Sequence, residues 1–155
     1  MLASALCLGG GIAVGPLPAF VQEQGARAVK AASPHPVFEE ADAVRVLSDM
    51  RQALESNNRG RLLKLFDARR MPGFAAFRDE IRAFVDTYDS VRMSYHLSQA
   101  VVDGEFGSAV ADVTVDASPS NGGANFHKSA RARLVLGWDG KSWKVVDFSP
   151  RDLFR

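Results

Sequence analysis

The C-terminal segment 131–155 constrains the fold more than any other part of this sequence. Two runs rich in Leu, Val, Trp and Phe flank the dipeptide Asp139-Gly140, which is a strong short-range signal for a β-hairpin. In the first run, apolar residues occupy every second position, so one face of the strand is apolar. If the loop contains an even number of residues, Trp143 and Val145 lie on that same face. The segment therefore predicts an antiparallel hairpin with one face in the core.

Asp147 falls on the same predicted face as Trp143, which is unusual for a carboxylate. A two-residue loop would place it across from Ala132, whose small side chain leaves space. An unpaired buried charge is too costly, so the carboxylate should be hydrogen-bonded or open to a water-filled cleft. We therefore predict a small-molecule site with Tyr95, Trp143 and Asp147 in its walls and Asp147 at its mouth. The alternative is an edge carboxylate paired with an arginine or a backbone N–H.

Helical periodicity precedes the strands. Apolar residues at spacings of three and four predict a first helix over about 38–57. The dipeptide Asn57-Asn58 could cap a short second helix, which is followed by a loop over 67–71. A third helix begins near Pro72, where proline suits the first turn, and carries an aromatic stripe that we attribute to the core.

The segment 91–115 changes to a period of two and predicts two further strands on either side of Gly104. A two-residue loop would place Tyr95 opposite Asp112, and the apolar residues of the two strands would then not share one face. A three-residue loop centred on Gly104, with this glycine in the left-handed region, opposes Tyr95 to Val113 instead. Burial favours the second register, because each apolar side chain that it buries contributes roughly 1.5–3 kcal/mol. We therefore predict the three-residue loop and a positive φ at Gly104.

Together these patterns predict an α+β domain in which three N-terminal helices pack on a curved four-stranded antiparallel sheet. Over about residues 38–148 the sequence resembles the nuclear transport factor 2-like (cystatin-like) superfamily. The resemblance is carried by the helix order and by three segments, LFDARRMPGFAAFRDEIRAF, VVDGEFGSAVADVTV and LGWDGKSWKVVDFSP. It implies a cone-like roll whose sheet wraps a helix and leaves a pocket at the open end. The superfamily includes isomerase-like and cyclase-like enzymes and non-catalytic binding modules, so the fold alone does not choose a function.

The N-terminal part of the chain is predicted to lie outside this domain. Residues 1–22 form a signal-like apolar segment, uncharged from Leu2 to Val21, with small residues that suit cleavage around Ala26-Arg27-Ala28. Residues 23–36 are a linker, and 37–155 are a single domain. We therefore expect an exported protein, periplasmic or extracellular. No stable membrane span is expected in the mature chain, because glycines and prolines interrupt the apolar run.

Charge and residue types argue against several functional classes. Nineteen basic and eighteen acidic residues give a formal net charge of +1, so no overall field attracts nucleic acid. Cys7 is the only cysteine, which excludes an intrachain disulfide and a cysteine-based metal site. The histidines His35, His96 and His127 are scattered, and no phosphate loop or nucleophile elbow is present. We expect no cofactor and no metal.

The predicted register also places His96 opposite Asp112, an arrangement from which an acid–base pair can be built. Both residues lie on the sheet face away from the helices, so we interpret them as a solvated or dimer-interface pair. No convergent acid–base set is recognised elsewhere, and we assign no catalytic residue.

These observations favour a non-catalytic exported module that binds a small apolar ligand or a protein partner. The first alternative is a small enzyme of the isomerase, dehydratase or cyclase type, which would require a deep pocket with a polar end. The second is a structural domain that forms a homodimer through the outer face of the sheet. That alternative would require the outer face to be comparatively apolar.

Overall fold

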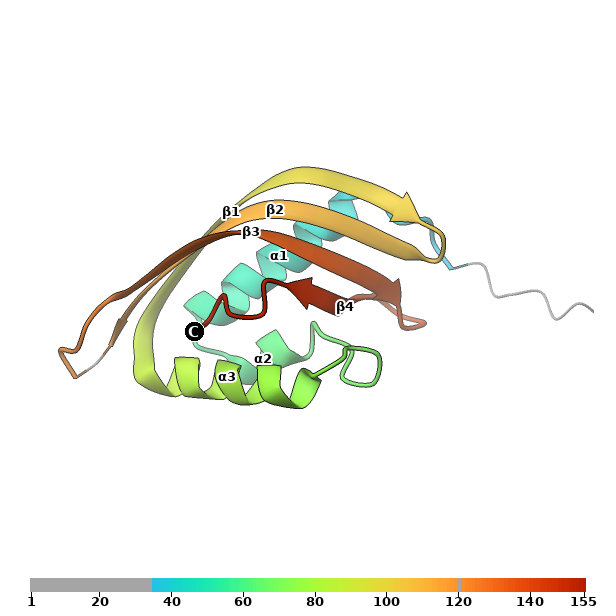
Figure 1. Cartoon of the computed structure of the whole chain (residues 1–155). Helices are drawn as coiled ribbons and strands as arrows, with labels where there is room; N and C mark the ends of the chain where they lie inside the picture. The colour runs from blue at the N-terminus through green and yellow to red at the C-terminus, as the bar shows by residue number, and fades with distance from the viewer. Residues whose placement is uncertain (1–34, 120) are drawn as a thin grey trace, which may run out of the picture. The chain divides into compact units, whose positions relative to one another are not determined.

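A computed structural model describes residues 35–119 and 121–155. The predicted signal-like segment 1–22 and nearly all of the linker lie outside this range. The elements follow in the order α1 (Glu40–Glu55), α2 (Arg59–Leu63), α3 (Phe74–Thr87), β1 (Tyr88–Asp103), β2 (Phe106–Pro119), β3 (Phe126–Trp138) and β4 (Trp143–Ser149). The strands form one antiparallel sheet in the order β1-β2-β3-β4, and the helices precede it (Figure 1). The α+β class is confirmed.

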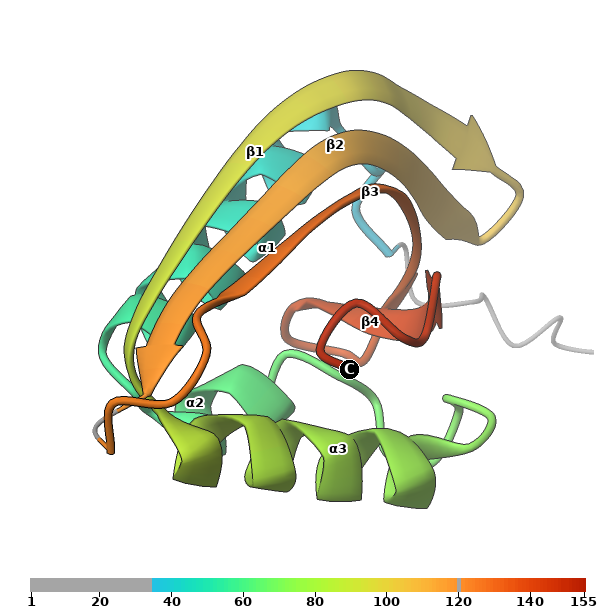
Figure 2. The same ribbon diagram turned by 60° about the vertical axis from the view of Figure 1, so that its left-hand side comes forward.

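Helix α1 lies on the concave side of the curved sheet formed by β1, β2 and β3, and α3 runs below it (Figure 2). The backbone N–H of Glu39 donates to Asp42 Oδ2 at 3.1 Å, which satisfies one of the free N–H groups at the start of α1. The predicted apolar stripe of this helix is buried, including Val46, Leu47 and Met50. No helix among the described residues has the length and apolar character needed to cross a membrane.

The predicted register of β1 and β2 is confirmed, but the predicted loop length is wrong. Tyr95 pairs with Val113, as burial of the apolar face requires. The loop contains only Gly104 and Glu105, and the extra residue sits in a β-bulge on β1, between Leu97 and Gln99. Gly104 has a φ of +61°, which confirms the predicted left-handed conformation.

The hairpin of β3 and β4 has a four-residue loop, so the expectation of an even loop is confirmed. Trp138 lies opposite Trp143 and Leu136 lies opposite Val145, all on the inner face. A bulge then follows Val145 and reverses the alternation. Asp147 is therefore exposed on the outer face, and its predicted place on the inner face is wrong.

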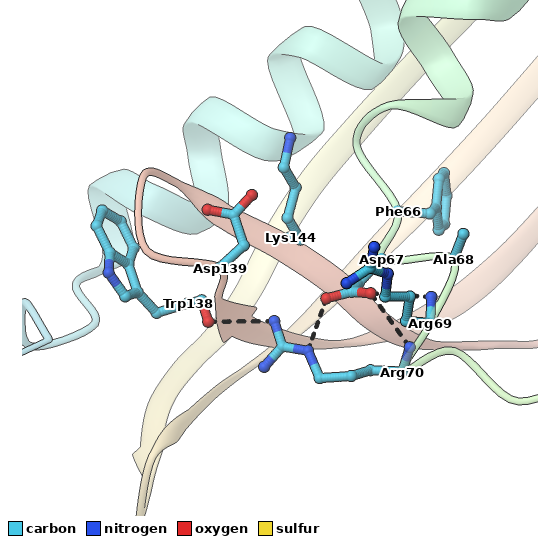
Figure 3. A pocket seen from close by; sticks show the side chains of 8 residues that line it. All are labelled: Phe66, Asp67, Ala68, Arg69, Arg70, Trp138, Asp139 and Lys144. Atoms are coloured by element: carbon cyan, nitrogen blue, oxygen red, sulfur yellow. Dashed lines mark hydrogen bonds and ion pairs between the residues drawn. The ribbon is translucent and has the colours of Figure 1, made fainter. Parts of the chain in front are cut away.

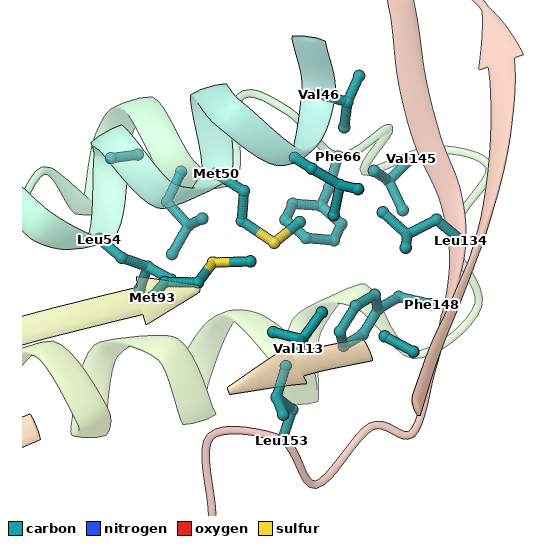
Figure 4. Close-up of a cluster of buried hydrophobic side chains, with 14 of the residues drawn as sticks. Val46, Met50, Leu54, Phe66, Met93, Val113, Leu134, Val145, Phe148 and Leu153 are labelled. Carbon is teal, nitrogen blue, oxygen red and sulfur yellow. The ribbon is translucent and has the colours of Figure 1, made fainter. Parts of the chain in front are cut away.

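The space between the sheet and the helices is filled by apolar side chains, as Figure 4 shows. The largest fully buried ones include Phe77, Phe148 and Met50. Among the polar and charged side chains that the structure describes, only Ser108 is buried. Its Oγ accepts from Arg133 Nε at 3.4 Å on the outer side of the sheet. Within the described residues, the interior of the roll therefore contains no buried titratable side chain.

Candidate ligand-binding site

Because the interior is filled, the candidate sites among the described residues are hollows on the surface. One of about 580 Å³ lies between the loop after α2 and the β3–β4 turn, with apolar walls from Phe66, Ala68 and Trp138 (Figure 3). We call it the groove. A hollow of about 520 Å³ beside β2 and β3 has mainly polar walls. The groove matches the usual make-up of a small-molecule site better, because such sites combine apolar walls with a few polar groups.

A short backbone bridge holds the loop after α2 against β4. Phe66 and Val145 form an isolated parallel β-bridge. The N–H of Val145 donates to Leu65 O at 2.8 Å, and the N–H of Asp67 donates to Val145 O at 2.9 Å. Since β4 is the edge strand of the sheet, this bridge also satisfies part of its free edge. It places the loop from Asp67 onward beside the β3–β4 turn.

Asp67 and Arg70 then lock the loop onto the turn. Asp67 accepts the backbone N–H groups of Arg69 and Arg70 and the Nε–H of Arg70, the last at 2.7 Å. Arg70 Nη2 donates to Trp138 O at 3.2 Å (Figure 3). The hydrogen bond from Arg70 is the main reason why the pKa of Asp67 lies below its usual value, and it outweighs the effect of burial. The pair is therefore ionised and internally neutral.

Asp139 shapes the other wall of the groove. Its Oδ1 accepts the backbone N–H groups of Lys141 and Ser142, both at 2.8 Å, which closes the turn. Burial raises the pKa of Asp139, but these two N–H groups and nearby cations outweigh it and leave the pKa below its usual value. This carboxylate is thus committed to the turn.

Two cations of the groove have no such carboxylate partner. Among the described residues, neither Arg69 nor Lys144 forms an ion pair, although Lys144 Nζ donates to Lys64 O at 2.8 Å. With the Asp67–Arg70 pair neutral, these two cations face the single negative charge of Asp139. The groove therefore combines apolar walls with a small excess of positive charge.

A second, smaller hollow of about 190 Å³ lies between α1 and the β3–β4 turn, and we call it the α1 hollow. It shares Trp138 and Lys144 with the groove, so the two hollows adjoin. Trp143, one of the predicted ligand-binding residues, lines it and is 7% exposed.

The structure does not bring the three predicted site residues together. Tyr95 is half-buried on β1 with the guanidinium carbon of Arg51 5.8 Å from its ring centroid, and it lines neither hollow. Asp147 pairs with Arg151 at 2.6 Å on the outer side of the sheet. This is the edge ion pair that the sequence analysis gave as its alternative. Ligand binding by Tyr95 or Asp147 stays a prediction without a hollow to support it.

Four residues that line the groove were not predicted from the sequence: Arg69, Arg70, Trp138 and Lys144. The only signal was indirect, since two tryptophans flank the β3–β4 turn and two arginines lie in a predicted loop. Nothing local indicates that this loop and this turn meet, because the bridge that joins them is a tertiary contact.

The outer face of the sheet is mostly polar. His96 lies opposite Asp112 as predicted, but Asp112 Oδ2 accepts from Ser98 Oγ at 3.1 Å. His127 Nδ1 lies 2.6 Å from Asp116 Oδ1. The structural-dimer alternative needs a comparatively apolar outer face. Val101, Val102 and Phe106 are exposed beside the β1–β2 turn, and a homodimer through the outer face stays a prediction. In the described ranges, no group of three or more His, Cys, Asp or Glu side chains is placed to hold a metal ion.

No family model matches the sequence, and no curated protein is significantly similar to it. Solved structures do match. A nuclear transport factor 2-like superfamily protein from Salmonella enterica serovar Typhimurium superimposes with a TM-score of 0.59 and 12% identity, over 70% of this chain and 86% of that one. The protein has the nuclear transport factor 2-like fold.

Two further structures with this fold have names that refer to enzymes. A ketosteroid isomerase-like protein from Erwinia carotovora atroseptica matches with a TM-score of 0.54 and 13% identity, over 72% of this chain and 95% of that one. A hexachlorocyclohexane dehydrochlorinase matches with a TM-score of 0.56 and 14% identity, over 70% and 80%. At these identities the nuclear transport factor 2-like fold is shared and no function is transferred.

Proposed function

We propose that this nuclear transport factor 2-like protein is a non-catalytic module that binds a small, largely apolar molecule in the groove. The observation that carries the proposal is the filled interior, in which the described residues provide no buried titratable side chain. General acid–base catalysis needs a proton donor or acceptor within hydrogen-bond reach of a bound substrate. The groove offers instead apolar walls and carboxylates already committed to local hydrogen bonds.

An enzyme of the isomerase, dehydratase or cyclase type is the alternative, and it draws support from the names of two solved structures with the same fold. Such an enzyme would need a substrate to enter the roll, where Phe66, Phe77 and Phe148 pack against one another with ring centroids 4.7–6.3 Å apart. Opening a site there would expose several of these rings, each worth roughly 1.5–3 kcal/mol when buried. This cost favours a surface site.

The test uses thermal unfolding of the full chain with a panel of small apolar molecules, followed by the variant Trp138→Ala. A molecule that binds the groove at a hundred times its Kd should stabilise the wild type by about 2.7 kcal/mol. The same molecule should give little or no shift with Trp138→Ala. Phe74→Ala is the matched control, because Phe74 is also a half-buried aromatic residue but lines neither hollow.

Two results would contradict the proposal. A molecule that stabilises Trp138→Ala as strongly as it stabilises the wild type binds elsewhere, and the groove would then not be the site. Conversion of a bound molecule into a product, at a rate that the purified protein accelerates, would favour the enzyme alternative.

We also propose that the protein is exported and that residues 1–22 are removed, on the basis of their apolar, uncharged sequence and the small residues that follow. Mass spectrometry of the native protein checks this proposal. A mature N-terminus near residues 26–28 is expected, and an intact Met1 on protein recovered from the cytosol would contradict it.

A further inference from the structure

Strand β1 leaves apolar side chains uncovered on the inner face of the sheet. The residues opposite them on β2 are all buried, but these side chains are half-buried or exposed: Tyr95, Leu97, Ala100 and Val102. Val102 is the most open of them, at 54% exposure, whereas Met93 at the start of the strand is buried. The inner face of β1 is therefore covered at its start and open from Tyr95 to the β1–β2 turn.

The backbone edge of β1 is open over the same stretch. This strand is outermost in the sheet, at the opposite edge from β4 (Figure 1). From Met93 to Asp103, one hydrogen bond to this edge is present within the described part of the chain, from the N–H of Met93 to Glu55 Oε1 at 3.4 Å. Because side chains and backbone groups alternate together along a strand, the inner-face residues of β1 all point their N–H and C=O groups away from β2. Such an edge is a template for pairing with another strand.

The β-bulge makes the edge of β1 complementary to itself. Residues an odd number of positions apart lie on opposite faces of a regular strand. The extra residue of the bulge, Ser98, reverses the alternation, so Leu97 shares the inner face with Ala100, and Tyr95 shares it with Val102. If two copies of β1 run antiparallel about an axis at the bulge, Leu97 lies opposite Ala100 of the second copy, and Tyr95 lies opposite Val102 of the second copy. Apolar side chains then meet on one face, and their backbone groups face one another.

The polar residues at the two ends of this edge fit the same register. It places Arg92 opposite Glu105 of the second copy and Ser94 opposite Asp103 of the second copy. All four side chains are exposed. Among the described residues, none of the three charged ones forms an ion pair. Opposite charges that face each other across two strands stabilise the pairing, and a two-fold axis repeats each contact.

We infer that the protein forms a two-fold symmetric dimer in which the β1 strands of two copies pair antiparallel about the bulge and join the two sheets into one. Each copy has one open β1 edge, so the assembly closes at two copies. This dimer differs from the predicted homodimer through the outer face, because it uses the edge of the sheet and leaves that face free. It is also independent of the groove, which lies beside β4 at the other edge.

The first experiment measures the dimer dissociation constant by sedimentation velocity over a concentration series of the full chain. The wild type should show a reversible monomer–dimer equilibrium. Val102→Lys should raise the dissociation constant at least about tenfold, because it places an unpaired charge against Tyr95 of the second copy. The exposure of Val102 lets the monomer fold as before, which urea unfolding checks. Val37→Lys is the matched control, since it adds the same charge at an exposed valine outside β1 and should leave the dissociation constant unchanged.

A second experiment tests the register through a disulfide between the two copies. The variant His96→Cys with Val101→Cys is made in a Cys7→Ser background, because Cys7 is the only native cysteine. The proposed register places positions 96 and 101 of the two copies opposite each other as a non-hydrogen-bonded pair, whose Cα atoms lie about 4.5 Å apart, within reach of a disulfide. Oxidation should therefore give a covalent dimer. Arg92→Cys with Val101→Cys is the control, since these positions lie several residues out of register and should not cross-link.

Each other outcome would overturn the inference. A wild type that sediments as a monomer at every concentration would mean that the bulge only keeps the edge from pairing. A dimer that Val102→Lys leaves intact, or in which positions 96 and 101 do not cross-link, would use another surface, such as the outer face. An equal effect of Val37→Lys would show a general effect of charge, and species larger than a dimer would contradict the closed symmetry.

Discussion

Gly107 on β2 allows the ring of Phe38 to lie directly on the strand, and we predict that Gly107→Ala destabilises the protein through this one contact. A Cβ at position 107 would lie 2.3 Å from Cγ of Phe38 and 2.4 and 2.5 Å from its two Cδ atoms. These distances are far below any van der Waals contact. The ring cannot easily move aside, because Phe38 is 4% exposed and meets Trp143 edge-on.

The magnitude follows from two limits. If the neighbouring side chains shift and Phe38 stays, the cost is that of overpacking, about 1–3 kcal/mol. If the ring leaves its place, the cost approaches that of Phe38→Ala, about 3–5 kcal/mol. We therefore expect Gly107→Ala to cost about 2–4 kcal/mol. In a Phe38→Ala background the added methyl group has room, and its cost should fall to zero or below, because alanine in a strand is preferred to glycine by roughly 0.5–1 kcal/mol.

The assay is a double-mutant cycle by urea unfolding, with a common m-value as the check on two-state behaviour. The coupling energy between Gly107→Ala and Phe38→Ala should be at least about 2 kcal/mol in favour of the double variant. Costs that add to within about 0.5 kcal/mol would refute the reasoning. They would mean that the glycine is needed for its backbone or that Phe38 does not lie against the strand.

Three further predictions concern single positions. At Gly104 an added Cβ meets no atom within 4 Å and φ is +61°, so Gly104→Ala should cost about 1 kcal/mol through the backbone alone, and Gly104→Asn should cost less in the same urea assay. The pKa of Asp67 is lowered in the folded protein, so its pairing with Arg70 stabilises the fold above about pH 3.8. This stabilisation is lost as the pH falls through the folded-state pKa, and the free energies of unfolding of the wild type and Asp67→Asn should therefore converge in acid. A difference between these two free energies that stays constant with pH would contradict the prediction. Asp147→Asn removes an exposed ion pair with Arg151 and should lower the unfolding free energy by less than about 1 kcal/mol, whereas a larger loss would show that Asp147 is structurally important.

The sequence determined the secondary structure and most of the strand pairing, because both follow from the period of the apolar residues. It also determined the register of β1 and β2, since only one parity buries Tyr95 and its neighbours against Val113. Where the extra residue sits was not determined. A three-residue loop and a two-residue loop with a bulge give the same register, and the structure has the bulge.

The position of the candidate site was decided by tertiary structure, because it depends on a bulge, on packing and on a contact between distant segments. Asp147 has the right spacing for the inner face, but a bulge after Val145 turns it outward, and alternation alone cannot reveal a bulge. Whether the roll is open or filled depends on the summed volumes of side chains from every helix and strand, which no local pattern reports. The groove exists because the loop at Asp67 is bonded to Val145, far along the chain. That bridge uses backbone groups, which are the same in every residue except proline and therefore leave no mark in the sequence.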